Sequence, residues 1–232
     1  MSVHFMKPVL NVVLVDINQK VVDAWRAVFA DNPEVQIHKG SILDQYVDAW
    51  VSPTNSRGSM DGGVDAVVKR RLGERIQVHV QQQIRTLYNG LMPVGTATCV
   101  PTGIASPKFL ISTPTMVTST QDVSETLNVA MACAAAFQAI HMQNNREPDS
   151  IQSVALVGLG AATGRVPPRV CANLMWSGYA LFNDYEFRDF DHLRAVVREH
   201  LGCTETLPET EKVRVKLPPQ EGPAESLPWL TR

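Results

Sequence analysis

The chain has 232 residues, of which 44% are hydrophobic, so it can bury one substantial core. Its formal net charge of -2 argues against a surface that binds nucleic acid strongly through its phosphates. The four cysteines form no pair at metal-binding spacing, and no apolar run approaches the length that spans a membrane. We therefore expect reduced thiols, no metal site, no membrane span and a cytoplasmic location.

The first half of the chain alternates short buried strands with amphipathic helices. Residues 9–15 (VLNVVLV) form a nearly continuous run of aliphatic side chains, which is typical of a strand buried on both faces. A helix is expected over residues 18–30, because its apolar side chains recur at helical spacing. The other elements expected in this half are strands at residues 35–38 and 48–51, a helix beginning near Val64, and a helix that carries Ile76, Val80, Ile84 and Leu87.

The second half continues this alternation. Asp122 and Glu125 have the spacing of a helix start signal, so they predict a long helix that ends before Pro148. Alternating strands and helices of these lengths predict an α/β layered domain with a largely parallel sheet. The remaining elements are expected as strands at residues 94–100, 109–112 and 153–157 and as helices at residues 167–182 and 190–201.

The composition changes near the end of the chain. Residues 203–232 are rich in Pro, Glu, Thr and Lys and contain few large apolar side chains, so we expect this tail to be flexible. The globular domain is therefore expected to span residues 1–202. No internal repeat is visible in the sequence.

Two glycine-rich stretches, residues 52–63 and 158–164, each follow a buried strand and precede a helix. In open α/β sheets, ligands bind at the carboxyl ends of the strands, where the first N–H groups of the following helix have no intrahelical partner. The positive end of the helix dipole stands behind these donors, which suits phosphate. Together the two stretches predict a site that holds a diphosphate without any lysine.

Other nucleotide-binding and hydrolase motifs fit the sequence less well. Gly158, Gly160 and Gly164 have the spacing G-x-G-x-x-x-G, which is one residue longer than the dinucleotide fingerprint. Asp16 closes a strand, as the ribose-binding acid of that fold does, but no glycine loop precedes it. A P-loop and the G-x-S-x-G elbow of serine hydrolases are both absent from the sequence.

The chain resembles the macrodomain family in an ordered set of motifs between Gly40 and Tyr179. That family typically has a Gly-Asp-Ile turn, an Asn-Ala-Ala-Asn element after a strand, a Gly-Gly-Gly-Val-Asp segment that opens a helix, and a late glycine loop. The counterparts here are KGSI at 39–42, VDAWV at 47–51, SPTN at 52–55, MDGGVD at 60–65, PVGTA at 93–97, FLIST at 109–113 and VGLGAATGRVP at 157–167. The opening segment VVLVDINQKVVDAW is similar to a divergent bacterial and phage-associated branch.

The resemblance implies a three-layer α/β/α sandwich with a mixed, largely parallel central sheet, and a cleft for ADP-ribose or an ADP-ribosylated target. It also draws attention to departures from the family pattern. Ser41 stands where many members carry the aspartate that hydrogen-bonds the adenine amino group, so adenine selectivity would require Asp16 or another acid. Residues 52–54 (SPT) replace Asn-Ala-Ala, and Lys69, four residues after Asp65, stands where hydrolytic relatives often carry histidine.

Asn55 and Asp65 are ten residues apart, the spacing of MacroD-type hydrolases, so the resemblance implies that both contact the distal ribose. The Asn55 amide would fix the sugar hydroxyls, and the Asp65 carboxylate would orient or deprotonate a water; the alternative for Asp65 is a partner for its helix dipole. Arg165 would cover the diphosphate or remain a solvated loop residue. The ligand-binding residues implied in this way are Ile42, Asn55, Gly62, Gly63, Val64, Asp65, Gly158, Gly160, Ala161, Ala162, Thr163, Gly164 and Arg165. No cofactor or metal is implied.

Two functional classes remain open at the level of sequence. One is an enzyme that removes ADP-ribose from a protein or a nucleic acid, or hydrolyses a small ADP-ribose ester. The other is a non-catalytic module that binds ADP-ribose. Asn55 and Asp65 favour the enzyme, whereas Ser41, Lys69 and residues 52–54 favour the binding module.

Overall fold

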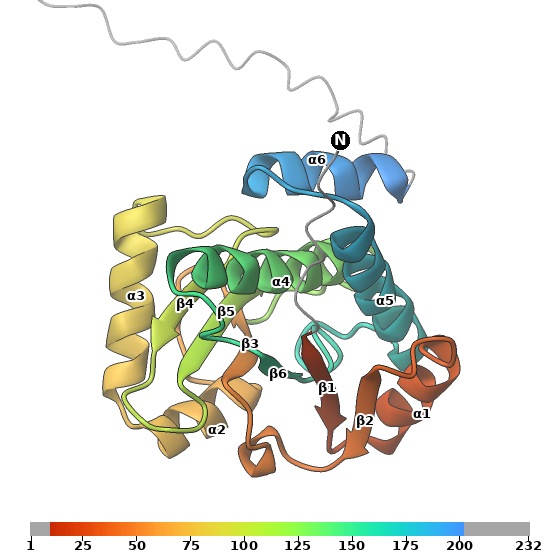
Figure 1. Ribbon diagram of the computed structural model, residues 1–232, viewed down its shortest axis with the longest axis horizontal. Helices are drawn as coiled ribbons and strands as arrows, with labels where there is room; N and C mark the ends of the chain where they lie inside the picture. The colour runs from red at the N-terminus through yellow and green to blue at the C-terminus, as the bar shows by residue number, and fades with distance from the viewer. Residues whose placement is uncertain (1–9, 202–232) are drawn as a thin grey trace, which may run out of the picture.

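The computed structural model of the chain describes residues 10–201, so the first nine residues and the expected tail lie outside the described residues. Figure 1 shows a central sheet with helices packed around it. The strands are β1 (Asn11–Asp16), β2 (Val35–Lys39), β3 (Ala49–Asn55), β4 (Thr98–Pro101), β5 (Phe109–Met116) and β6 (Ser153–Leu156). The α-helices are α1 (Gln19–Val28), α2 (Gly63–Leu72), α3 (Arg75–Tyr88), α4 (Asn128–Arg146), α5 (Pro168–Asp184) and α6 (Phe190–His200).

The sheet has the strand order β2-β1-β6-β3-β5-β4. All neighbouring strands are parallel except β4, which runs antiparallel to β5 at the edge. The prediction of a mixed, largely parallel sheet is therefore confirmed. Because β6 is inserted between β1 and β3, the glycine-rich stretches that follow β3 and β6 become neighbours at the carboxyl edge of the sheet.

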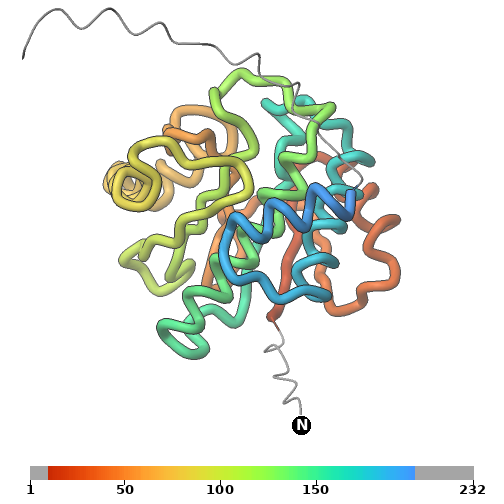
Figure 2. Tube along the Cα trace, turned by 90° about the horizontal axis from the view of Figure 1, so that it is seen from above, coloured from red at the N-terminus to blue at the C-terminus, as the bar shows by residue number. Residues whose placement is uncertain are grey.

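Side chains that alternate along the strands build a separate core on each face of the sheet. Val12 and Leu14 of β1 pack with α1, α4 and α5 on one face, whereas Val13 and Val15 pack with α2 and α3 on the other. This arrangement confirms the three-layer sandwich. Helix α6 packs on the outside of α4, where Leu193 contributes to a third cluster. In Figure 2, which is seen from above, α6 (blue) lies over the layer that contains α4 and α5.

Two elements begin several residues later than the sequence pattern predicts. The strand expected at residues 94–100 begins at Thr98, because Gly95 has a φ of 84° and residues 93–96 form a turn. The long helix begins at Asn128 and not at the Asp122 start signal. Asp122 instead accepts hydrogen bonds from the N–H and hydroxyl of Ser124, so it caps a local turn before the helix.

Candidate functional site

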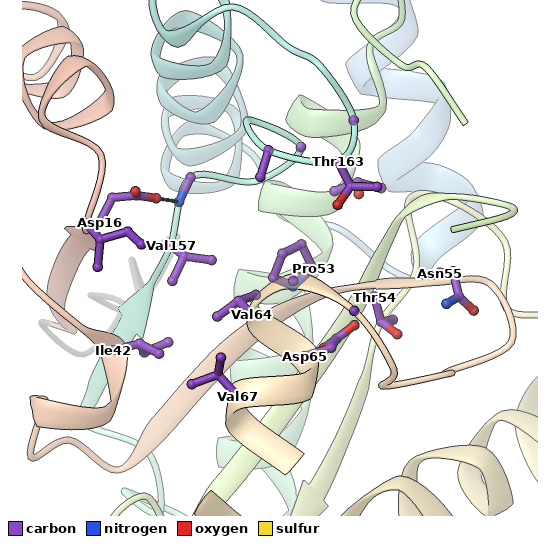
Figure 3. A pocket seen from close by; sticks show the side chains of 18 of the residues that line it. Asp16, Ile42, Pro53, Thr54, Asn55, Val64, Asp65, Val67, Val157 and Thr163 are labelled. Carbon is purple, nitrogen blue, oxygen red and sulfur yellow. Dashed lines mark hydrogen bonds between the residues drawn. The ribbon is translucent and has the colours of Figure 1, made fainter. Parts of the chain in front are cut away.

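A cleft of about 370 Å³ opens at the carboxyl ends of the parallel strands, and both glycine-rich stretches border it. Figure 3 shows side chains of β1, β3, α2 and the loop after β6 gathered around it. The lining residues are Val15, Asp16, Ile17, Gly40, Ser41, Ile42, Pro53, Thr54, Asn55, Ser59, Gly62, Gly63, Val64, Asp65, Val67, Thr115, Met116, Ser119, Val157, Gly158, Gly160, Ala162, Thr163 and Gly164.

The first wall of the cleft is the N-terminal turn of α2. Gly62 precedes the helix in an extended conformation, and Gly63 has a φ of 55°, which favours glycine because a Cβ is strained there. The N–H groups of Gly63, Val64 and Asp65 belong to the first helical turn and have no intrahelical acceptor. This wall therefore offers backbone donors together with the positive end of the helix dipole.

The second wall is the loop that follows β6. Its shape is fixed by hydrogen bonds from Val166 N to Gly160 O, at 3.1 Å, and from Val123 N to Gly164 O, at 3.0 Å. Among the described residues, the N–H groups of Gly160, Ala162 and Thr163 have no acceptor. No lysine or arginine is found among the lining residues of this cleft. An anion bound between the walls would therefore depend on backbone donors.

Asp65 is buried below the first turn of α2, with 5% of its surface exposed. Its Oδ1 accepts a hydrogen bond from the hydroxyl of Ser52, a fully buried residue of β3, and Figure 3 shows its carboxyl beside Thr54. Burial raises the pKa of Asp65 to about 7, against the opposing effect of the Ser52 hydrogen bond and the Thr54 hydroxyl. The carboxyl can therefore gain or lose a proton near neutral pH, which suits a proton-transfer group.

The raised pKa of Asp65 makes the stability of the protein sensitive to pH. The folded state binds the Asp65 proton more tightly than the unfolded state, because folding raises the pKa of this carboxyl from 3.8 to about 7. Its contribution to stability is therefore complete below pH 3.8 and is lost as the pH rises through 7, by about 1.4 kcal/mol per pH unit and roughly 4 kcal/mol in all.

We expect Asp65→Asn to remove this dependence, because an amide fills the same space and does not titrate. Urea unfolding of the wild type and the variant, measured at intervals from pH 4 to 8, should show the variant gaining stability relative to the wild type as the pH rises. The other carboxyls titrate in both proteins and cancel in the difference. Parallel stability curves would contradict a raised pKa for Asp65.

The side-chain amide of Asn55 is fully engaged by protein partners. Its Nδ2 donates to Ser59 O at 3.0 Å and to the Ser119 hydroxyl at 3.1 Å, and its Oδ1 accepts from the N–H groups of Arg57 and Ser59. Asn55 therefore shapes the turn after β3 and ties it to the segment after β5. Ser119 is an exposed side chain, so it is the partner that a ligand hydroxyl could most easily replace.

Lys69 supports the first glycine-rich stretch and does not line the cleft. Its Nζ donates to Asp61 Oδ1 at 2.6 Å and to Gln77 Oε1 at 3.2 Å, and Gln77 Oε1 also accepts from Met60 N. The hydrogen bond to Asp61 is the main reason that the pKa of Lys69 is raised. These contacts fasten residues 60–61, just before the N-terminal turn of α2, to α2 and α3.

The structure brings most of the predicted ligand-binding residues together in the cleft, but not Ala161 and Arg165. Ala161 packs against the hydrophobic core. The Arg165 side chain is 71% exposed, and its guanidinium lies 3.5 Å from the Asp122 carboxylate. Gly158 lines the cleft, but its N–H is already taken, because it donates to Asp16 Oδ2 at 3.0 Å.

Several lining residues were not predicted. Thr115, Met116 and Ser119 come from the end of β5 and the segment after it, and Ile17 directly follows β1. No glycine-rich pattern marks either place in the sequence. Both segments follow parallel strands, and this position is the one feature of the sequence that could have placed them in the cleft. It does so only when the order of the strands in the sheet is known.

No group of three or more His, Cys, Asp and Glu side chains within residues 10–201 is arranged to hold a metal ion. No helix in this part of the chain combines the length and the apolar character needed to cross a membrane.

The sequence of the chain matches the family model described as Macro domain over residues 51–175, which is more than half of its length. The chain belongs to the macrodomain family. An uncharacterized protein of Aquifex aeolicus is 33% identical to this macrodomain over 142 residues, which are 61% of this chain and 78% of the relative. A macro domain-containing protein of Streptomyces griseus is 32% identical over 82 residues, 35% of this chain and 46% of that protein.

Solved macrodomain structures share the fold. The macrodomain of Mycobacterium tuberculosis DarG superposes with a TM-score of 0.53 at 22% identity, covering 64% of this chain and 91% of that one. The Oceanobacillus iheyensis macrodomain with ADP has a TM-score of 0.50 at 13% identity, covering 70% of this chain and 89% of that one. At these identities the likeness establishes the three-layer architecture and not a shared activity.

Proposed function

We propose that this macrodomain binds ADP-ribose or a derivative of it in the cleft and hydrolyses an ADP-ribosyl linkage. The observation that carries the binding half is the pair of glycine-rich walls, which offer backbone N–H groups to a cleft without lysine or arginine. A diphosphate between the walls would accept from both sets of donors. The Oceanobacillus iheyensis macrodomain has been solved with ADP and a variant of it with ADPR, which supports this choice of ligand.

The catalytic half of the proposal is assigned to Asp65 with Asn55. In the hydrolytic step, Asp65 would take a proton from a water whose oxygen forms the new bond to the anomeric carbon of the distal ribose. The linkage to the target would break, its electron pair would leave with the target atom, and that atom would receive the proton. The raised pKa of Asp65 supports this role, because a base that titrates near neutral pH works best there.

The second candidate function is a non-catalytic module that binds ADP-ribose, and two specific contacts favour it. The Asp65 carboxyl is only 5% exposed and already bonded to Ser52, so it also serves to join α2 to β3. The Asn55 amide is bonded on all sides by the protein. Measured turnover of an ADP-ribosylated substrate separates the two candidates.

The partner under this proposal is an ADP-ribosylated protein, nucleic acid or small ester, and the place of action is the cytoplasm. The formal net charge of -2 supports recognition of the ADP-ribose group itself over general binding of nucleic acid. No cofactor enters the proposed reaction, because its only co-reactant is water.

Calorimetry tests the binding half. ADP-ribose is expected to bind with a dissociation constant in the micromolar range, roughly -8 kcal/mol. AMP is expected to bind more weakly, because it lacks the diphosphate that would lie between the two walls and the distal ribose. The absence of binding heat with ADP-ribose, or equal affinities for ADP-ribose and AMP, would overturn the proposed ligand.

A further inference from the structure

The end of the cleft that Asn55 occupies carries a contact that a ligand would have to break. Figure 3 shows Asn55 at this end and Asp16 at the other. The Nδ2 group of Asn55 has two hydrogen atoms, and it donates to Ser59 O at 3.0 Å and to Ser119 Oγ at 3.1 Å. A ligand hydroxyl can therefore bond to Nδ2 only by taking the place of one of these two partners.

Three of the four hydrogen bonds of the Asn55 side chain are made with the turn that follows it. Its Oδ1 accepts from the N–H groups of Arg57 and Ser59, and its Nδ2 donates to the carbonyl oxygen of Ser59. The same turn is closed by a hydrogen bond from Gly58 N to Asn55 O at 2.9 Å. All of these partners are backbone groups, so replacing any of them requires the backbone of the turn to move.

The fourth partner, Ser119, is a side chain that can move by itself. Its residue is exposed, belongs to the segment after β5 and lines the cleft. A serine side chain changes between staggered χ1 positions without any change in the backbone, and exposed side chains do so rapidly. Ser119 Oγ can therefore leave the Asn55 amide while the cleft keeps its shape.

Other hydrogen bonds hold the segment after β5 in place when this contact is broken. Ser56 N donates to Met116 O at 3.0 Å, which joins the turn after β3 to the end of β5. Val117 N donates to Gln121 Oε1 at 2.8 Å, which fixes the first residues of the segment. Loss of the bond between the two side chains thus frees one amide hydrogen and leaves the surrounding backbone connected.

A hydroxyl oxygen of a sugar is chemically the same kind of acceptor as the hydroxyl oxygen of Ser119. Either one can accept from the neutral Nδ2 group of Asn55, but not both at the same position. A ligand that ends at its diphosphate offers no such hydroxyl to this end of the cleft. A ligand with a further ribose beyond the diphosphate does offer one, so it competes with Ser119.

We propose that Ser119 is a specificity-determining residue, whose hydroxyl occupies in the free protein the place on the Asn55 amide that a hydroxyl of the distal ribose takes in the complex. This inference rests on the proposed function, because it names the contact that ADP-ribose displaces in the cleft. Ser119 lowers the affinity for ligands that reach Asn55 and does not change the affinity for shorter ones.

The test compares ADP-ribose with ADP by calorimetry on the full chain. The two ligands share the adenosine and the diphosphate, and only ADP-ribose carries the distal ribose. Ser119→Ala is expected to raise the affinity for ADP-ribose by roughly 3- to 10-fold, because no protein hydroxyl then has to leave the Asn55 amide. The affinity for ADP is expected to stay within about twofold of the wild-type value, because ADP does not reach Asn55.

Three further variants show whether the gain arises at this contact. Ser119→Thr restores a hydroxyl and should return the affinity for ADP-ribose to the wild-type value. Thr120→Ala removes a hydroxyl from the exposed neighbouring residue and should have no effect. In an Asn55→Ala background, Ser119→Ala should no longer raise the affinity, because the amide that links the two effects is absent.

The outcomes separate this inference from the proposed function. A lower affinity for ADP-ribose in Ser119→Ala would mean that Ser119 contacts the ligand itself, which would overturn the displacement. An unchanged affinity, or an equal gain for ADP or in Thr120→Ala, would overturn it as well. Each of these results leaves ADP-ribose binding intact. Failure of the wild type to bind ADP-ribose would overturn the proposed function and this inference with it.

Discussion

Replacing Asp65 by alanine is expected to lower the turnover of an ADP-ribosylated substrate by roughly 10²–10⁴-fold, the range for loss of a positioned proton-transfer group. The variant keeps the backbone N–H groups of both glycine-rich walls, so its affinity for ADP-ribose should fall much less. The measurement is single-turnover hydrolysis near pH 7, where the Asp65 carboxyl titrates. Ester-linked and base-linked substrates both belong in the assay, because the cleft does not choose between the two linkages.

Three further variants give this experiment its controls. Asp65→Asn preserves the shape of the buried carboxyl and should lose turnover to a similar extent, since an amide does not accept a proton. Asn55→Ala should lower both affinity and turnover, because its amide is proposed to contact the ribose before and during the reaction. Asp122→Asn changes an exposed carboxylate beside the second wall and should have little effect on turnover.

The results also distinguish the two candidate functions. A binding module would show the same negligible turnover in the wild type and in Asp65→Ala, with only affinity reporting the change. Turnover by the wild type that persists undiminished in Asp65→Ala would remove Asp65 from the mechanism. In that case the contact of Asp65 with Ser52 would be its whole role, as a bond that joins α2 to β3.

The elements that were predictable from sequence are those whose burial leaves a strong local pattern. Strand β1 is aliphatic along most of its length because helices cover both faces of the sheet, and its run of valines records this directly. Strand β3 was placed too short, because Ser52 and Thr54 look like loop residues. Both are buried on the face toward α2, where Ser52 bonds Asp65, so their polarity reflects a tertiary contact.

The helix start signal at Asp122 failed for a related reason. Its side chain has two short-range uses, as a cap for a helix or for a tight turn, and the sequence pattern is similar for both. The turn prevails here, and the backbone N–H of Val123 donates to Gly164 O, so the segment supports the second wall. A contact between residues 123 and 164 leaves no trace in a local pattern.

The glycine-rich backbone of the candidate site was predictable from the sequence. The contacts that depend on the order of the strands were not. The glycine-rich stretches are visible in the sequence, because positive φ values such as that of Gly160 favour glycine. Asp16 joins the site only because β6 lies beside β1, which brings Gly158 N within 3.0 Å of its carboxylate. The engagement of the Asn55 amide by Ser119 likewise depends on β3 pairing with β5.

The second large effect is expected at Gly164, where substitution by alanine should weaken ADP-ribose binding by about 100-fold, roughly 2.7 kcal/mol. A Cβ added to Gly164 would lie 2.7 Å from the carbonyl oxygen of Gly160 and 2.8 Å from a methyl group of Val123. The first contact is with backbone, so the loop itself must shift, and its free N–H groups shift with it. Because the proposed site binds the diphosphate through these donors, a displaced loop loses several hydrogen bonds at once.

Gly62→Ala is the matched control for this prediction, since it adds the same methyl group to the other wall. A Cβ there meets no atom within 4 Å, and the φ of -144° suits any residue, so the turn should keep its shape. Its affinity for ADP-ribose is expected to fall by less than about tenfold, the effect of a methyl group beside an undistorted set of donors. Calorimetry on both variants, with melting temperatures to verify folding, decides the matter. Wild-type affinity in Gly164→Ala would mean that the loop after β6 does not hold the ligand, whereas equal large losses in both variants would point to simple obstruction of the cleft.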